Sequence, residues 1–281
     1  MKALVKREPG AGHLSLEDLP LPKIGDDDLL IRISCCGICG SDLHIEDGVH
    51  PCQPPVVIGH EFSGVIEGMG PNVREFAVGD AVAFLDGWDP FPGVGSNGGF
   101  AEFMRAPASC MWRTPPGVSQ EEASQFETIV TPMRLVRDEA QANAGDRVVV
   151  TGVGIIGLMT AAIAKLSGAH VTVFGTEADE PVRLPLARGV GADEVLVFNE
   201  ETVKFVQRAR PNKWIDASGS PLALQAATSC VEPSGLIVVA GLGHGPYDLD
   251  MTRVTYNNIT IRGVWGGRPK YVREVAELIR E

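Results

Sequence analysis

The first part of the chain consists of short apolar runs separated by turn residues. Each run is either mostly apolar or alternates between apolar and polar positions, and Gly, Pro or Asp residues lie close to its ends. Such runs are typical of short strands. They cover residues 29–34, 56–58, 63–67, 81–84 and 100–106. The pattern predicts an irregular, β-rich domain.

The pattern changes to helical spacing after Ser119. Ser119 and Glu122 stand in the order of a capping box, which is typical of a helix N-terminus. We expect a helix over residues 121–141 that joins two domains. The predicted division of the chain is therefore 1–120 for the first domain and 121–281 for the second.

The second half alternates apolar runs with helical stretches. Right-handed crossovers through the intervening helices would produce an open, mostly parallel sheet. The predicted buried strands are residues 147–151, 170–174, 194–198, 213–217, 236–240 and 259–264. We therefore predict a six-stranded, doubly wound α/β domain, with a helical stretch at residues 271–281.

A glycine-rich turn directly follows the first of these strands and opens an apolar helical stretch at residues 158–166. Glycines let such a turn close, let backbone N–H groups approach a pyrophosphate, and let the helix pack on the strand. A tight structural turn is the alternative, but the strand-turn-helix context favours a dinucleotide site. The turn residues are Gly152, Val153, Gly154, Ile155, Ile156 and Gly157.

The residues after the second strand of this domain bear on the choice between NAD and NADP. A carboxylate about 20 residues beyond the glycines normally binds the ribose hydroxyls of NAD. Here Gly175 removes that carboxylate, Thr176 offers a hydroxyl, and Arg183 lies within reach of a 2′-phosphate, which favours NADP. Alternatively, Glu177 could bind the ribose of NAD, with Arg183 a solvated helix residue. The sequence therefore leaves both NAD and NADP as candidate cofactors.

Composition excludes some classes of function. Lys and Arg total 24 against 36 Asp and Glu, so the net charge of −12 repels nucleic acids and anionic membranes. Residues 1–10 carry no secretory signal, and the most apolar stretch, 153–164, is shorter than the ~20 residues that span a bilayer.

Three of six cysteines are crowded at Cys35, Cys36 and Cys39. We expect a cytoplasmic protein with a metal site.

Candidate metal ligands lie on two short, Gly-bounded turns. Cys39 offers a thiolate, and His60 and Glu61 offer an imidazole and a carboxylate. These donors suit Zn²⁺, which in catalytic sites takes three protein ligands and leaves one position open. Alternatively, His60 caps a turn and Cys39 packs as a small apolar residue.

The strings at 36–44 and 59–61 resemble those of the medium-chain dehydrogenase/reductase family, in particular its zinc alcohol and polyol dehydrogenases of the sorbitol, threonine and glucose dehydrogenase type. The resemblance runs from Met1 to about Gly267. It implies a GroES-like, β-rich catalytic domain followed by a Rossmann domain. Further landmarks in the same order lie at residues 78–80, 98–102, 145–148 and 216–219.

The resemblance also implies roles for individual residues. Cys39 and His60 would bind the catalytic zinc, and Glu61 would be an alternating ligand or a neighbour of the ligands. Glu127 occupies the place of the remaining ligand, although Thr128 replaces the proline that usually follows it.

A proton relay is implied as well. Ser41 resembles the family's relay hydroxyl, which passes the substrate proton through the nicotinamide ribose to His44 and then to solvent. The alternative for His44 is a surface histidine.

Two features depart from the family. Many members hold a second, structural zinc in a cysteine-rich lobe, but residues 80–98 contain no cysteine, so we expect one catalytic zinc and no structural zinc. The lobe is also shortened. The family usually continues beyond the position of residue 281, and without that segment the cofactor cleft would be more open to water.

These features predict a zinc-dependent oxidoreductase that transfers a hydride from a secondary alcohol, polyol or sugar hydroxyl to NAD(P). The alternatives are a zinc-free quinone or enone reductase of the same superfamily and an inactive NAD(P)-binding relative. The resemblance also implies a homo-oligomer through the strand at 259–264, whose unpaired sheet edge would invite a symmetric partner.

Overall fold

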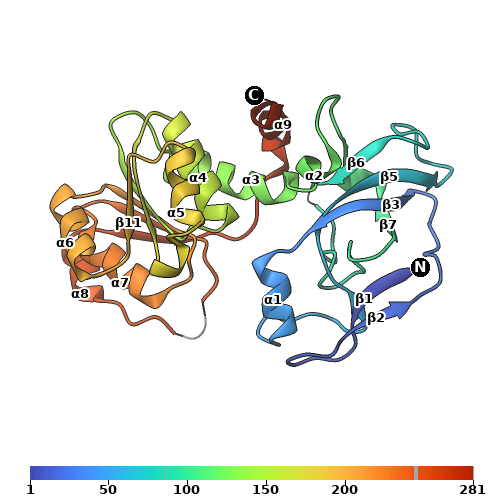
Figure 1. Cartoon of the computed structure of the whole chain (residues 1–281), viewed down its shortest axis with the longest axis horizontal. Coiled ribbons are helices and arrows are strands. Elements are labelled where there is room, and N and C mark those ends of the chain that lie inside the picture. The colour runs from blue at the N-terminus through green and yellow to red at the C-terminus, as the bar shows by residue number, and fades with distance from the viewer. Residues whose placement is uncertain (86, 244–245, 281) are drawn as a thin grey trace. The chain divides into compact units, whose positions relative to one another are not determined.

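The computed structural model describes residues 1–85, 87–243 and 246–280 (Figure 1). The chain divides into two compact units. The first contains Met1–Glu127 and the segment from Arg268 onward, and the second contains Thr128–Gly267. The sequence had placed the division at residue 120 and had assigned the C-terminal segment to the second domain.

The first unit is built on two antiparallel sheets. The larger has the strand order β7-β3-β5-β6-β8 and the smaller has the order β2-β1-β4. The predicted β-rich domain is therefore confirmed, although the sequence did not predict β1, β2, β8 or the short helix α1 (Gly40–Glu46). The strands are β1 (Lys2–Lys6), β2 (Leu14–Asp18), β3 (Asp28–Gly37), β4 (Val56–Val57), β5 (Glu61–Met69), β6 (Ala81–Phe84), β7 (Phe103–Pro107) and β8 (Met111–Arg113).

The helix predicted at 121–141 is broken into shorter pieces. The Ser119 hydroxyl accepts a hydrogen bond from the Glu122 N–H at 3.2 Å, and the Ser119 N–H donates to the Glu122 carboxylate at 2.8 Å, so the predicted capping box is confirmed. Pro132 lies inside the second piece and has no N–H to donate, which disfavours one continuous α-helix. The pieces are α2 (Gln120–Ala123), α3 (Phe126–Arg134) and a π-helix at Leu135–Ala140.

The second unit is a six-stranded parallel sheet with the order β11-β10-β9-β12-β13-β14. This order confirms the predicted doubly wound sheet. Every predicted run contains a strand, because strands covered on both faces appear as continuous apolar runs. The strands are β9 (Arg147–Thr151), β10 (His170–Gly175), β11 (Glu194–Val197), β12 (Lys213–Asp216), β13 (Leu236–Val239) and β14 (Thr260–Gly263). The helices are α4 (Ile155–Leu166), α5 (Arg183–Gly189), α6 (Glu200–Ala209), α7 (Pro221–Cys230) and α8 (Met251–Tyr256).

The C-terminal segment forms helix α9 (Val272–Arg280) and belongs to the first unit. The guanidinium group of Arg273 lies 5.8 Å from the ring centre of Trp112 on β8, which joins this helix to the larger sheet. Glu281, the last residue of the helix predicted at 271–281, lies outside the described residues. Among the helices that the structure describes, none is both long enough and apolar enough to cross a bilayer.

Candidate active site

Pairing between β3 and β5 brings the candidate metal ligands together. Gly37, at the end of β3, lies opposite Glu61 at the start of β5. The chain then turns into α1, whose N-cap residue is Cys39, while His60 immediately precedes β5. Two segments about 20 residues apart in sequence are thereby placed side by side.

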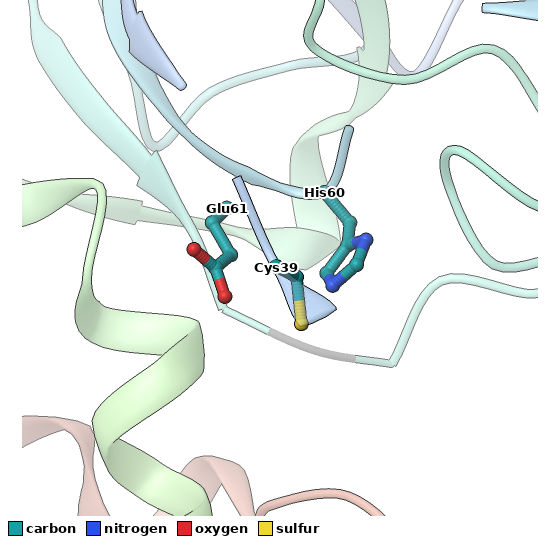
Figure 2. Close-up of side chains that lie close together, drawn as sticks. All are labelled: Cys39, His60 and Glu61. Carbon is teal, nitrogen blue, oxygen red and sulfur yellow. The ribbon is translucent and has the colours of Figure 1, made fainter. Parts of the chain in front are cut away.

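The donor atoms of Cys39, His60 and Glu61 form a single cluster. The sulfur, an imidazole nitrogen and a carboxylate oxygen all lie within 4.8 Å of one another (Figure 2). Ligand atoms of a tetrahedral zinc are roughly 3.3–3.8 Å apart, as follows from Zn–N and Zn–S distances of about 2.0 and 2.3 Å. A small contraction of the cluster would therefore suffice to hold the ion.

The protonation states of this cluster also suit a cation. Burial lowers the pKa of His60 to about 4, with a smaller contribution from His50, so the imidazole is neutral at pH 7 and can donate a lone pair. Burial, together with the charges of Glu61 and Glu127, raises the pKa of Cys39 to about 12. A bound divalent cation would reverse this effect and stabilise the thiolate. The residues present therefore fit a zinc ion.

The glycine turn of the second unit has the backbone geometry of a nucleotide site. A Cβ atom on Gly157 would lie 1.9 Å from the carbonyl oxygen of Gly152, so the turn can close this tightly only with glycine there. Gly154 is the N-cap of α4, and its Cβ position meets no atom within 4 Å. No acidic residue occupies the first turn of α4. This N-terminus therefore attracts an anion such as a pyrophosphate.

A cavity of about 510 Å³ lies at the carboxyl ends of β9, β10 and β12. Among its lining residues are Asp179 and five of the predicted nucleotide-binding residues, namely Gly152, Val153, Gly154, Thr176 and Arg183. The predicted residues Ile155, Ile156, Gly157 and Glu177 are not among them.

The comparisons with known proteins match both domains. The alcohol dehydrogenase GroES-like domain matches residues 25–116, and the zinc-binding dehydrogenase domain matches residues 156–281. The L-threonine 3-dehydrogenase of Bacillus licheniformis is 33% identical over 95% of this chain and 84% of its own length. The chain belongs to the zinc-dependent alcohol and polyol dehydrogenases of the medium-chain dehydrogenase/reductase family.

Two further matches, a curated relative and a solved structure, each cover the whole of this chain. A sorbitol dehydrogenase of Halalkalibacterium halodurans is 29% identical and covers 100% of this chain and 89% of its own. The crystal structure of an NAD-dependent alcohol dehydrogenase superposes with a TM-score of 0.90 at 26% identity, covering 100% of this chain and 89% of its own. The predicted family and its two-domain fold are thus confirmed.

In this zinc dehydrogenase, Asp42 lies against two residues of the three-donor cluster, a role that we had not assigned from the sequence. One oxygen of its buried carboxylate accepts a hydrogen bond from the Cys39 N–H at 2.9 Å. The other lies 3.8 Å from His60 Nδ1. Asp42 therefore touches the elements that carry two of the three donors. The signal was available, because Asp42 belongs to the 36–44 string and would be a costly residue to bury without a partner.

The remaining predicted residues of the first unit lie near the cluster. Ser41 and His44 are three residues apart on α1, so they share one face of the helix. Ser41 hydrogen-bonds to Cys39 and thereby lowers the pKa of that thiol. Glu127 lies in the first turn of α3, outside the three-donor cluster, yet its charge acts on Cys39.

Asp179 is a second residue that we had not predicted. Its Oδ2 accepts hydrogen bonds from the Thr176 N–H at 2.8 Å and from the Thr176 hydroxyl at 2.7 Å, and its Oδ1 lies 3.3 Å from Arg183. Burial raises the pKa of Asp179, but these partners outweigh burial and the net shift is downward, so the carboxylate stays charged. The predicted phosphate-binding pair, Thr176 and Arg183, is therefore joined through an acidic group.

Proposed function

We propose that this zinc dehydrogenase oxidises a secondary alcohol, polyol or sugar hydroxyl at one catalytic zinc, with NAD or NADP as hydride acceptor. The single observation that carries the proposal is the three-donor cluster of Cys39, His60 and Glu61 on a chain that belongs to this family. We assign Glu127 as a further ligand or a charge near the ion, because it already acts on Cys39. Residues 87–98 contain no cysteine, which supports the absence of a structural zinc.

When bound, zinc would polarise the substrate hydroxyl as a Lewis acid while the nicotinamide accepts the hydride. The protein's own contribution is to hold the donors in a dry site. His60 is 5% exposed and Glu61 is 3% exposed, so electrostatic interactions there are little weakened by water. Asp42 fixes the N-cap of α1 and thereby the position of Cys39.

Proton removal is assigned to α1. Ser41 lies next to Cys39, and His44 lies one turn further along the same helix face. We propose that Ser41 relays the substrate proton and that His44, a half-buried imidazole on the same helix face, passes it towards solvent.

The nucleotide is assigned to the second unit. The N-terminus of α4 would bind the pyrophosphate, and the cavity beyond β10 would bind the adenosine ribose. Asp179 favours the ribose hydroxyls of NAD and Arg183 favours the phosphate of NADP, so the two residues set the ratio in which the cofactors are used.

We also propose a homo-oligomer that forms through β14. This strand lies at one edge of the parallel sheet, and most of its residues are exposed. A second copy could pair with its free edge about a twofold axis.

The test combines metal analysis with turnover. Purified protein should contain about one zinc per chain, and a panel of polyols, sugars and simple alcohols should reduce NAD or NADP in a chelator-sensitive reaction. Nucleotide binding without zinc or turnover would instead identify an inactive relative. Turnover of quinones or enones that survives complete metal removal would identify a zinc-free reductase.

A further inference from the structure

The segment where many relatives carry a structural-zinc lobe is occupied here by aromatic residues. Between β6 and β7 the chain contains Trp88 and Phe91 in a short turn, which we call the aromatic turn (residues 88–96). Trp88 is 8% exposed and belongs to the core of the first unit, and Phe91 packs against that core. The segment is thus part of the core.

Hydrogen bonds within the aromatic turn hold its backbone. The carbonyl oxygen of Phe91 accepts hydrogen bonds from the N–H groups of Val94, Gly95 and Ser96, at 3.2, 2.9 and 3.2 Å. The Ser96 hydroxyl donates to the Pro90 carbonyl at 2.8 Å. These bonds close the turn on itself and fix the point from which the Phe91 side chain leaves the backbone.

Gly98 and Gly99, which follow the aromatic turn, lie directly against the turn that carries His60. The Gly98 N–H donates to the Val57 carbonyl at 2.7 Å, and the Gly99 N–H donates to the Gly59 carbonyl at 2.8 Å. A Cβ atom on Gly98 would lie 2.0 Å from the Gly59 carbonyl oxygen, so the two backbone segments can approach this closely only because residue 98 is glycine. The turn that carries His60 is therefore hydrogen-bonded to the residues that directly follow the aromatic turn.

The Phe91 ring also packs against the imidazole ring of His60. The two ring centres are 5.3 Å apart at an interplanar angle of 54°. Phe84 contacts both aromatic residues of the turn, with ring centres 5.9 Å from Phe91 and 6.3 Å from Trp88. Phe84 in turn stacks on Phe62 of β5 at 5.2 Å. A continuous set of rings thus runs from the core of the sheet to one face of His60.

We propose that Phe91 is a positioning residue that holds the His60 imidazole in its metal-binding orientation, so that the aromatic turn supports the zinc site in a chain whose lobe has no cysteines. The proposal rests on the proposed function, because it requires zinc at His60. A ring that restricts the imidazole lowers the entropy lost when the metal binds, and an apolar cover limits the access of water to the ligand. Both effects slow the escape of zinc.

The test measures zinc release to a coloured chelator in Phe91→Leu, with Phe76→Leu as the matched control. Both phenylalanines are partly buried against the same core, but only Phe91 is seen to contact His60. Phe91→Leu should release zinc about tenfold faster than the wild type, whereas Phe76→Leu should stay within about twofold of it. Thermal unfolding of the zinc-free proteins should show similar losses of stability in both variants.

A third variant, Phe91→Tyr, keeps an aromatic ring against His60 and should release zinc at nearly the wild-type rate. Equal release rates in Phe91→Leu and Phe76→Leu would overturn the positioning role while leaving the zinc site intact. A wild-type protein that binds no zinc would instead overturn the proposed function itself, so the two failures are distinguishable.

Discussion

The glycine turn of the second unit and the three-donor cluster of the first differ in how the chain brings their groups together. The turn presents backbone groups from six consecutive residues, and its geometry depends on the absence of side chains at positions such as Gly157. The cluster presents three side chains from two separated segments, and it depends on the β3–β5 pairing that joins them. The first site is local in sequence, whereas the second exists only once the sheet has formed.

Removal of a metal ligand should have the largest effect. His60→Ala should lower turnover by a factor on the order of 10³ or more, because the Lewis-acid contribution is lost and not merely weakened. Nucleotide affinity, measured by fluorescence titration, should stay close to the wild-type value. His170→Ala, in an exposed histidine at the start of β10, is the control and should retain activity. Loss of nucleotide affinity in His60→Ala would show that the two sites are not separable.

A methyl group in the glycine turn should produce the opposite pattern. Gly157→Ala places a Cβ where the Gly152 carbonyl now lies, so the turn must open and nucleotide affinity should fall about 100-fold, which is about 2.7 kcal/mol. Zinc content should not change. Gly189→Ala, at a helix position with open space around it, is the matched control. Normal nucleotide binding by Gly157→Ala would refute the steric argument.

A buried lysine near the N-terminus is hydrogen-bonded to the last residue of α1, the helix whose N-cap is Cys39. The Lys6 ammonium is inaccessible to solvent and donates hydrogen bonds to the carbonyls of Gly10, Gly12 and Glu46, the last residue of α1. Lys6→Met should lower the free energy of unfolding by about 2 kcal/mol, because three backbone carbonyls lose a charged hydrogen-bond donor. Chemical denaturation measures this loss. Lys165→Met breaks an exposed pair with Asp193 and should cost less than about 1 kcal/mol.

The smallest expected change concerns the cofactor. Asp179→Asn removes the negative charge beside Arg183 while preserving the shape of the side chain, so the ratio of kcat/KM for NADP to that for NAD should rise about tenfold. Arg183→Gln should shift the same ratio in the other direction. Steady-state kinetics with both cofactors measure the ratio. An unchanged ratio in both variants would exclude this pair as the determinant of cofactor choice.

The same contrast between local and assembled features explains what could be predicted from the sequence. The central parallel strands β9, β10, β12 and β13 were predictable because each is a mostly buried apolar run, and the glycine turn follows β9 directly. Strands β1 and β2 were missed because each mixes charged and apolar residues over only five positions. The helix predicted at 121–141 neglected Pro132.

Individual site residues follow the same rule. The sequence suggested Cys39, His60 and Glu61 as donors, but their proximity depends on strand register, which is a tertiary property. Asp42 and Asp179 each lie three residues after an N-cap residue, in the spacing of a capping box, so their hydrogen bonds to Cys39 and Thr176 could have been predicted. The approach of Asp42 to His60 could not, because it depends on the fold.

The central claim, that the chemistry takes place at a zinc bound by Cys39, His60 and Glu61, is tested most directly by the zinc content of two cysteine variants. Cys36 and Cys39 lie three residues apart and are both half-buried, but only Cys39 belongs to the donor cluster. We predict that Cys36→Ala retains about one zinc per chain and that Cys39→Ala retains almost none. Equal zinc content in the two variants would contradict the assignment.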